Sequence, residues 1–215
     1  MINRRTFTTL LAGMAGVAAA PRVPWSQTAM PKTVLYASVG PEFTFFDIDI
    51  ADAALVKHGA VTLPANIQYA WPHPSTRYFY VVSSNGGPGV IPGDTHLASA
   101  FRVDPGSGTL TPHGAPQALP SRPIHCCVDA TGGYLLTAFN FPSAVTVHRI
   151  NPDGTLGDLV SQPTKPDSGI FAHQIRTTPS NQSAILVTRG NNAGDGKPED
   201  PGALKVFGFQ NGVLT

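Results

Sequence analysis

Two of the seven histidines in this 215-residue chain stand shortly before a turn that leads into an apolar strand. His125 lies four residues ahead of Asp129, and His173 lies five residues ahead of Thr178. A neutral imidazole can take a proton from water and so act as a general base. We predict that both histidines occupy one repeated position and face a common site, with hydrogen-bonded structural histidines as the alternative. The other five are interpreted as surface or turn residues.

Arg176 and Arg189 are the basic residues nearest to His173. A guanidinium stays protonated and can stabilise negative charge that develops on an oxygen. No cofactor and no metal is predicted. Cys126 and Cys127 are adjacent, which strains a disulfide and does not match the spacing of metal ligands, so they are interpreted as packing residues on a strand.

The elements that must position these side chains form a repeat. An apolar strand preceded by a turn occurs at 73–82, 129–138 and 178–187, and a strand without the turn occurs at 34–38. With Tyr36, Tyr80, Leu136 and Ile185 taken as equivalent, the intervals are 44, 56 and 49 residues. Periods of this length, built of strands, are typical of β-propeller blades, which must stack on neighbouring blades.

A second pattern keeps the same phase. An alternating strand, a polar turn and a short apolar segment occur at 100–110, 147–156 and 206–214, with a weaker copy at 45–49. Gly, Pro, Asp and Asn favour such turns, so we expect a hairpin at the outer edge of each blade. The sequence predicts an all-β propeller of four-stranded antiparallel blades rather than a β-sandwich with regular hairpins.

About four blades are expected, spanning 33–74, 75–130, 131–179 and 180–215. We favour an incomplete part of a seven-bladed ring over a minimal four-bladed ring. Missing blades or a partner would then be needed to cover the open face and sheet edge. Two long Gly-rich loops, 84–96 and 190–202, are expected to join the middle strands of the second and fourth blades, either as site-building loops or as mobile polar ones.

Composition narrows the classes of partner. The chain is 41% hydrophobic and 13% charged, with 22 Gly and 21 Pro, which suits a turn-rich β-protein. Without Arg4, Arg5 and Arg22 there are 11 basic residues against 13 acidic ones, so nothing favours nucleic acid or an anionic membrane surface. Three carboxylates in the loop 190–202 do not match the spacing of an EF-hand.

The first 30 residues resemble a twin-arginine export signal followed by a linker. Arg4 and Arg5 precede a short Gly/Ala-rich apolar run at 10–20, which is too short for a transmembrane helix. We expect residues 31–215 to form the folded domain, located in the periplasm or secreted, with no stable membrane insertion after removal of the signal. An uncleaved N-terminal anchor is the alternative.

The phase of the repeat, the Asp-Gly-Thr-Leu hairpin at 153–156 and the Pro123-Ile124-His125 and Ala172-His173 elements resemble the seven-bladed propeller lactonase family. That family includes propeller-type 6-phosphogluconolactonase and fungal carboxymuconate lactonizing enzyme. The resemblance covers about 33–215, the first half of a family member. A His before a Thr-Pro-Ser-Asn turn, at 178–181, matches the family's catalytic histidine and places it at His173.

The resemblance implies opening of a sugar lactone by metal-independent general-base activation of water. In the family the His works with an Arg and a Glu whose elements would lie beyond residue 215, and neither Arg176 nor Arg189 stands in that Arg element. The expected partner is a small lactone or sugar-derived ligand. A non-catalytic binding or scaffold propeller of the YVTN type and an inactive truncated fragment are the alternatives.

Overall fold

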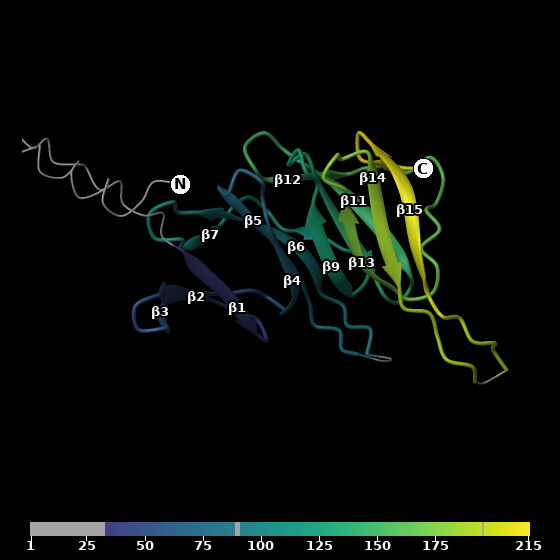
Figure 1. Ribbon diagram of the computed structural model, residues 1–215, viewed down its shortest axis with the longest axis horizontal. Helices are drawn as coiled ribbons and strands as arrows, with labels where there is room; N and C mark the ends of the chain where they lie inside the picture. Colours follow the sequence, from purple (N-terminus) through teal and green to yellow (C-terminus); the bar gives the residue numbers. More distant parts are fainter. Residues whose placement is uncertain (1–32, 89–90, 195) are drawn as a thin grey trace, which may run out of the picture. The chain divides into compact units, whose positions relative to one another are not determined.

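The computed structural model describes residues 33–88, 91–194 and 196–215, and the regular elements in this part are all β-strands. They form four antiparallel sheets that follow one another in chain order (Figure 1). Within this part of the chain no helix has the length and hydropathy to cross a membrane. The predicted export signal falls on residues outside the described part. The all-β prediction is confirmed.

Each sheet runs from an inner strand to an outer hairpin, except that three strands are described in the first. The first sheet contains β1 (Val34–Val39), β2 (Glu42–Asp49) and β3 (Ala54–Thr62). The second contains β4 (Asn66–Pro72), β5 (Tyr78–Ser84), β6 (His96–Val103) and β7 (Leu110–Pro112), and β8 (Gln117–Ala118) pairs with β6. The third contains β9 (Pro123–Val128), β10 (Tyr134–Phe139), β11 (Ala144–Ile150) and β12 (Leu156–Leu159). The fourth contains β13 (Ala172–Thr177), β14 (Ser183–Thr188), β15 (Ala203–Gln210) and β16 (Val213–Leu214).

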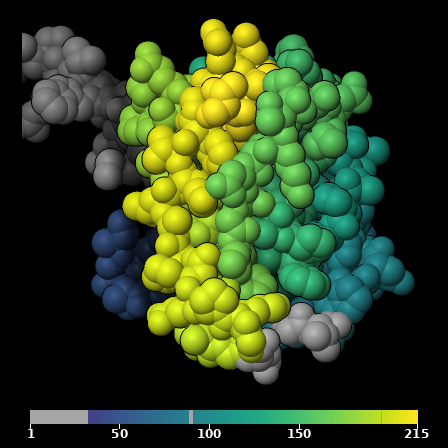
Figure 2. All heavy atoms as spheres, turned by 90° about the vertical axis from the view of Figure 1, so that its right-hand side faces the viewer, coloured from purple at the N-terminus to yellow at the C-terminus, as the bar shows by residue number. Residues whose placement is uncertain are grey.

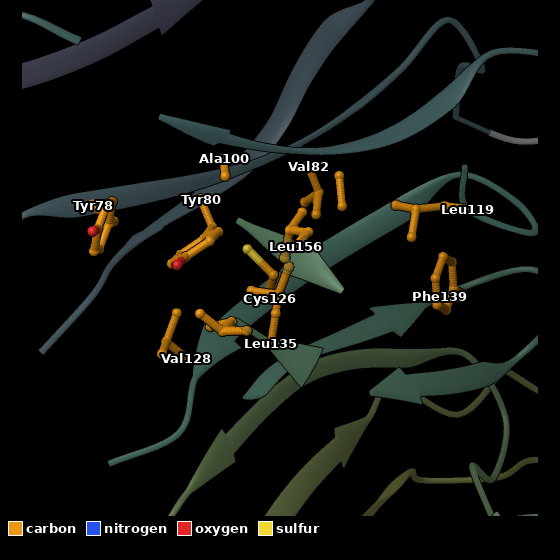
Figure 3. Close-up of a cluster of buried hydrophobic side chains, with 12 residues drawn as sticks. Tyr78, Tyr80, Val82, Ala100, Leu119, Cys126, Val128, Leu135, Phe139 and Leu156 are labelled. Carbon is orange, nitrogen blue, oxygen red and sulfur yellow. The ribbon is translucent and has the colours of Figure 1, made fainter. Parts of the chain in front are cut away.

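The hydrophobic core lies between successive sheets. Apolar side chains alternate along each middle strand, so one sheet supplies side chains to two layers. Figure 3 shows the layer between the second and third sheets, where Tyr80 and Val82 of β5 lie with Cys126 of β9 and Leu135 of β10, all fully buried. Similar clusters join the first sheet to the second and the third to the fourth. This stacking of sheets is that of propeller blades rather than of a sandwich.

A repeated hydrogen bond connects neighbouring sheets. The Tyr36 hydroxyl of β1 donates to the Gly108 carbonyl in the outer hairpin of the second sheet at 2.7 Å. The equivalent Tyr80 of β5 donates to the Gly154 carbonyl in the outer hairpin of the third sheet at 2.9 Å. Both glycines have positive φ, and a Cβ on Gly154 would overlap the Tyr78 ring, so this turn requires glycine.

The predicted boundaries of the blades were wrong, although their number was right. The inner strand of each sheet was assigned to the end of the preceding unit, but β4, β9 and β13 pair with the strands that follow them. The second, third and fourth blades therefore begin near residues 66, 123 and 172 rather than at 75, 131 and 180. The turns at 73–77, 129–133 and 178–182 were taken as boundaries between blades, whereas each of them joins the first two strands of one sheet.

The two long loops join the second and third strands of their sheets, as predicted. Loop 84–96 connects β5 to β6, loop 190–202 connects β14 to β15, and both extend from the lower edge of the sheets in Figure 1. The fourth sheet presents its free face in Figure 2, where β15 lies at the surface. Leu204 and Val206 of β15 are 69% and 66% exposed on this face.

Candidate functional site

The candidate site is built on the three inner strands, which lie side by side with β9 between β4 and β13. Each inner strand pairs on one side with the second strand of its own sheet. Side chains near its start can therefore meet those of the neighbouring inner strands at the centre of the arrangement.

A β-bulge interrupts each inner strand at the same place. The pairing skips one residue between Ile67 and Tyr69 in β4, between Pro123 and His125 in β9, and between Ala172 and Gln174 in β13. The extra residues are Gln68, Ile124 and His173. A bulge bends the strand and redirects the extra side chain, and bulges are frequent beside functional sites.

His125 and His173 do not occupy one repeated position, which corrects the prediction from sequence. His125 pairs with Ala138 and corresponds to Tyr69 and Gln174, whereas His173 is the extra residue of its bulge. Spacing to the next turn differs by one residue between the two histidines, and in a strand that difference changes the direction of the side chain. A positive charge on His173 nevertheless contributes to lowering the pKa of His125.

His125 is a buried, neutral imidazole. It is 4% exposed, its ring lies 4.1 Å from the Tyr69 ring and 5.9 Å from the Trp71 ring between centroids, and neither ring nitrogen has a hydrogen-bond partner among the described residues. Burial, with the nearby charges of Arg176 and His173, lowers the pKa of His125 to about 4. Near neutral pH its side chain is therefore uncharged and packed against aromatic rings.

His173 and Arg176 lie on β13 with their side chains exposed. The Arg176 guanidinium stands over the Trp71 ring of β4, 4.7 Å from its centroid. This cation–π contact spans the two inner strands that flank β9, at the level of Cys127 near the end of that strand, where the Arg176 charge also acts on the Cys127 thiol. A base and a cation thus share one strand beside a neutral histidine.

Arg189 belongs to a different part of the surface. Its guanidinium lies 4.9 Å from the centroid of the Phe171 ring, and its backbone N–H donates to the Phe171 carbonyl at 2.9 Å. Of the two predicted arginines, Arg176 is the one whose charge acts on His125.

Sequence reasoning missed the aromatic side of the site and one buried histidine. Tyr69 and Trp71 alternate with Ala70 on β4 and stack with centroids 6.3 Å apart. Their alternation was the available signal, but the stretch was assigned to the end of the first blade. His148, interpreted as a surface or turn residue, is 4% exposed on β11, and burial lowers its pKa.

The two cysteines are packing residues on a strand, as predicted, and they pack into different layers. Cys126 lies in the cluster between the second and third sheets and Cys127 in the cluster between the third and fourth. Burial raises the pKa of the Cys126 thiol and raises that of Cys127 to about 12. Both are therefore protonated, unreactive thiols at neutral pH.

No set of three or more His, Cys, Asp and Glu side chains with the geometry of a metal site occurs in residues 33–88, 91–194 and 196–215. At the base of the loop 190–202, Asn191 and Asp200 exchange two backbone hydrogen bonds of 2.9 Å. The Asp200 carboxylate accepts from the Gly202 N–H at 2.7 Å. This carboxylate therefore helps to shape the loop.

Comparison with protein families gave one match. The model of a family described as "Lactonase, 7-bladed beta-propeller" matches residues 37–192. A search of curated proteins gave no match.

Several solved structures share the fold. A periplasmic gluconolactonase from Pseudomonas aeruginosa is 21% identical with a TM-score of 0.60, and the match covers 82% of this chain and 50% of that one. A protein from Lactobacillus plantarum is 12% identical with a TM-score of 0.64, covering 86% and 54%. A candidate 6-phosphogluconolactonase from Bacteroides fragilis is 18% identical with a TM-score of 0.59, covering 88% and 67%. The chain thus spans about half the length of the first two.

Proposed function

The chain belongs to the seven-bladed β-propeller lactonase family, and we propose on that premise that it contributes the general base for opening a lactone ring. The base is His173. The observation that carries the proposal is its place in the bulge of β13, where an exposed imidazole stands outside the strand pairing, on the same strand as Arg176. His125 serves as a neutral neighbour rather than as a second base.

The proposed reaction needs one base and one site of positive charge. A ring nitrogen of His173 takes a proton from water, and the water oxygen bonds to the lactone carbonyl carbon. Negative charge passes to the carbonyl oxygen, which the Arg176 guanidinium stabilises. The carbon–oxygen bond of the ring then breaks, and the ring oxygen recovers the proton from the imidazolium. The product is an open-chain hydroxy acid.

The proposed substrate is a sugar lactone, and the proposed location of the protein is the periplasm. The twin arginines at residues 4 and 5 support export, and the similar Pseudomonas protein is a periplasmic gluconolactonase. Export argues against a phosphorylated cytoplasmic substrate. The Tyr69 and Trp71 rings would offer flat apolar surface to the carbon face of a sugar ring.

A second candidate is a binding propeller without catalysis. The stacked Tyr69 and Trp71 pair, with Arg176 over the indole, is by itself sufficient to hold a small anionic or sugar-derived ligand. Catalysis and binding therefore have to be measured separately.

The test is hydrolysis of D-glucono-1,5-lactone by the purified chain, followed by titration of released acid and compared with spontaneous hydrolysis. We expect a rate above the spontaneous one and a loss of about 10²-fold in His173→Ala. Added imidazole should restore part of the rate in that variant. Arg176→Gln should lower the rate more than Arg189→Gln, which is the matched control on the Phe171 ring.

Two results would contradict the proposal. If His173→Ala retains the full rate, the base lies elsewhere. If the wild-type chain gives only the spontaneous rate while it still binds gluconolactone, the binding function is the better assignment.

A further inference from the structure

A hollow separate from the His173 site lies between the third and fourth sheets. It has a volume of about 730 Å³, and its walls are the β10–β11 loop, the β12–β13 loop and the β14–β15 loop. The lining includes Asn140 and Phe141 from the first of these, Phe171 from the second, and Asn191 and Lys197 from the third. His173 and Arg176 are not among the residues that line it.

Hydrogen bonds connect the walls of the hollow to one another in the ligand-free chain. Ser143 and Ser168 each donate their hydroxyl to the other's backbone carbonyl at 2.8 Å. The Ala172 N–H donates to the Ser143 hydroxyl at 2.9 Å, which adds the start of β13 to the same network. Two of the three loops are therefore held at a fixed separation, as a preformed binding site requires.

Phe171, one of the aromatic residues that line the hollow, has a strained backbone conformation. Phe171 has φ of 57°, in the left-handed region that costs a bulky side chain free energy. Hydrogen bonds from Arg189 N–H to its carbonyl and from Gly190 N–H to the Ile170 carbonyl hold this conformation. Phe141, on the opposite loop, is 71% exposed. Two phenyl rings thus offer apolar surface to the hollow.

Polar groups in the lining lack partners within the described part of the chain. Oδ1 of Asn140 is buried and accepts no hydrogen bond, which is costly for an amide oxygen. The Asn191 amide donates to the carbonyls of Asn192 and Pro198, which leaves its oxygen free to accept. Lys197, the charged residue described in the lining, has an exposed ammonium without an ion pair there.

We propose that this hollow binds a sugar acid, a polyhydroxylated molecule with one carboxylate. Hydroxyl groups of the ligand would donate to the oxygen of Asn191. Its C–H surface would pack on Phe141 and Phe171, and its carboxylate would meet the Lys197 ammonium. The site does not use His173, so binding of a sugar acid here can be tested independently of lactone hydrolysis.

The test is a titration of the isotope-labelled chain with sodium D-gluconate, followed by amide and side-chain NMR shifts. A molecule of this size should bind with a dissociation constant on the order of 1 mM. Saturable shifts are expected at Asn140, Phe171, Asn191 and their neighbours. Methyl β-D-glucoside, which lacks the carboxylate, should bind several-fold more weakly.

Variants separate the contribution of the apolar surface to gluconate binding from the contribution of the lysine charge. Phe141→Ala should weaken gluconate binding about tenfold. Lys197→Gln should remove the preference for gluconate over the glucoside, while Lys165→Gln, an exposed lysine on the β12–β13 loop, should not. Ile50→Ala, an exposed apolar residue in the first sheet's turn, is the control for Phe141→Ala.

The proposal is overturned if gluconate causes no saturable shifts in the hollow, or if Phe141→Ala and Lys197→Gln bind as the wild type does. Shifts confined to β4, β9 and β13 would also overturn it, because they would place the ligand at the His173 site instead. Loss of hydrolysis in His173→Ala with unchanged gluconate shifts in the hollow is the expected combination if both proposals hold.

Discussion

At the scale of single residues, the environment of His125 determines its charge. Tyr69 and Trp71 surround the imidazole with aromatic carbon, and Arg176 adds a positive charge nearby. Both effects disfavour the imidazolium, and burial is the larger. His125 therefore packs in the fold as an uncharged ring, and protonation of its imidazole is expected to lower the stability of the folded chain.

We expect the free energy of unfolding to fall as the pH falls from about 6.5 to about 4. Over this range the unfolded chain binds a proton at residue 125 that the folded chain, with its pKa of about 4, does not. The loss can reach about 3 kcal/mol from this residue. Urea unfolding of the wild type and of His125→Phe, measured across the range, checks the value.

His125→Phe cannot be protonated and should show a shallower decline. His113→Gln, a substitution in the segment that follows β7, is the control and should keep the wild-type slope. Equal slopes for wild type and His125→Phe would mean that His125 does not set the acid sensitivity.

At the scale of the elements, a tyrosine of one sheet contacts the outer hairpin of the next at each of the three described junctions. The Tyr36 and Tyr80 hydroxyls reach the outer hairpins of the next sheets, and Tyr78 packs against the Gly154 turn. In the fourth sheet the glycine of the outer hairpin, Gly212, lies in the same way against Tyr134. The contact between a glycine turn and an aromatic ring therefore recurs along the chain.

Removal of one such hydroxyl should destabilise the chain measurably. Tyr80→Phe leaves the buried Gly154 carbonyl without its donor, at a cost of about 1 to 2 kcal/mol. Tyr134→Phe is the matched control, because its hydroxyl accepts only an exposed bond of 3.3 Å from Arg149, and it should change stability by less than about 0.5 kcal/mol. Equal denaturation midpoints for the two variants would contradict the assignment.

The repeat explains how much of the fold could be predicted from sequence. Middle strands such as that of Tyr80 are apolar runs, and outer hairpins carry glycine at positive φ, so both are visible as patterns. The inner strands were assigned to the wrong neighbour because the turn that follows each of them was interpreted as a boundary between blades. The position of His173 depends on a bulge. Its trace in the sequence is a difference of one residue in the spacing to the next turn, five for His173 against four for His125, and both histidines were nevertheless assigned to one repeated position.

At the scale of the whole described domain, the fourth sheet has one covered face and one open face. Leu204 and Val206 of β15 pair in register with Val187 and Ile185 of β14, and these four residues form an apolar patch. Exposed β-sheet faces of this composition favour association with other surfaces. The 215-residue chain is therefore expected to self-associate.

Sedimentation at increasing protein concentration should reveal this association. The double variant Leu204→Thr with Val206→Thr keeps β-branched residues in the strand while it makes the face polar, so it should sediment as a monomer. Ile50→Thr removes an equally exposed apolar side chain from a turn and should associate as the wild type does. A wild-type chain that stays monomeric at all concentrations would show that this face does not mediate self-association.

The bulge of the inner strands has a consequence for how the molecule can change over evolutionary time. Residues three apart in a regular strand point to opposite faces. Ala172 and Ile175 are nevertheless both fully buried, because the extra residue between them, His173, brings their side chains to the same face. The same holds for Pro123 and Cys126 around Ile124. A substitution at the extra residue leaves its buried neighbours in place, so reaction chemistry can be gained or lost there while stability is preserved.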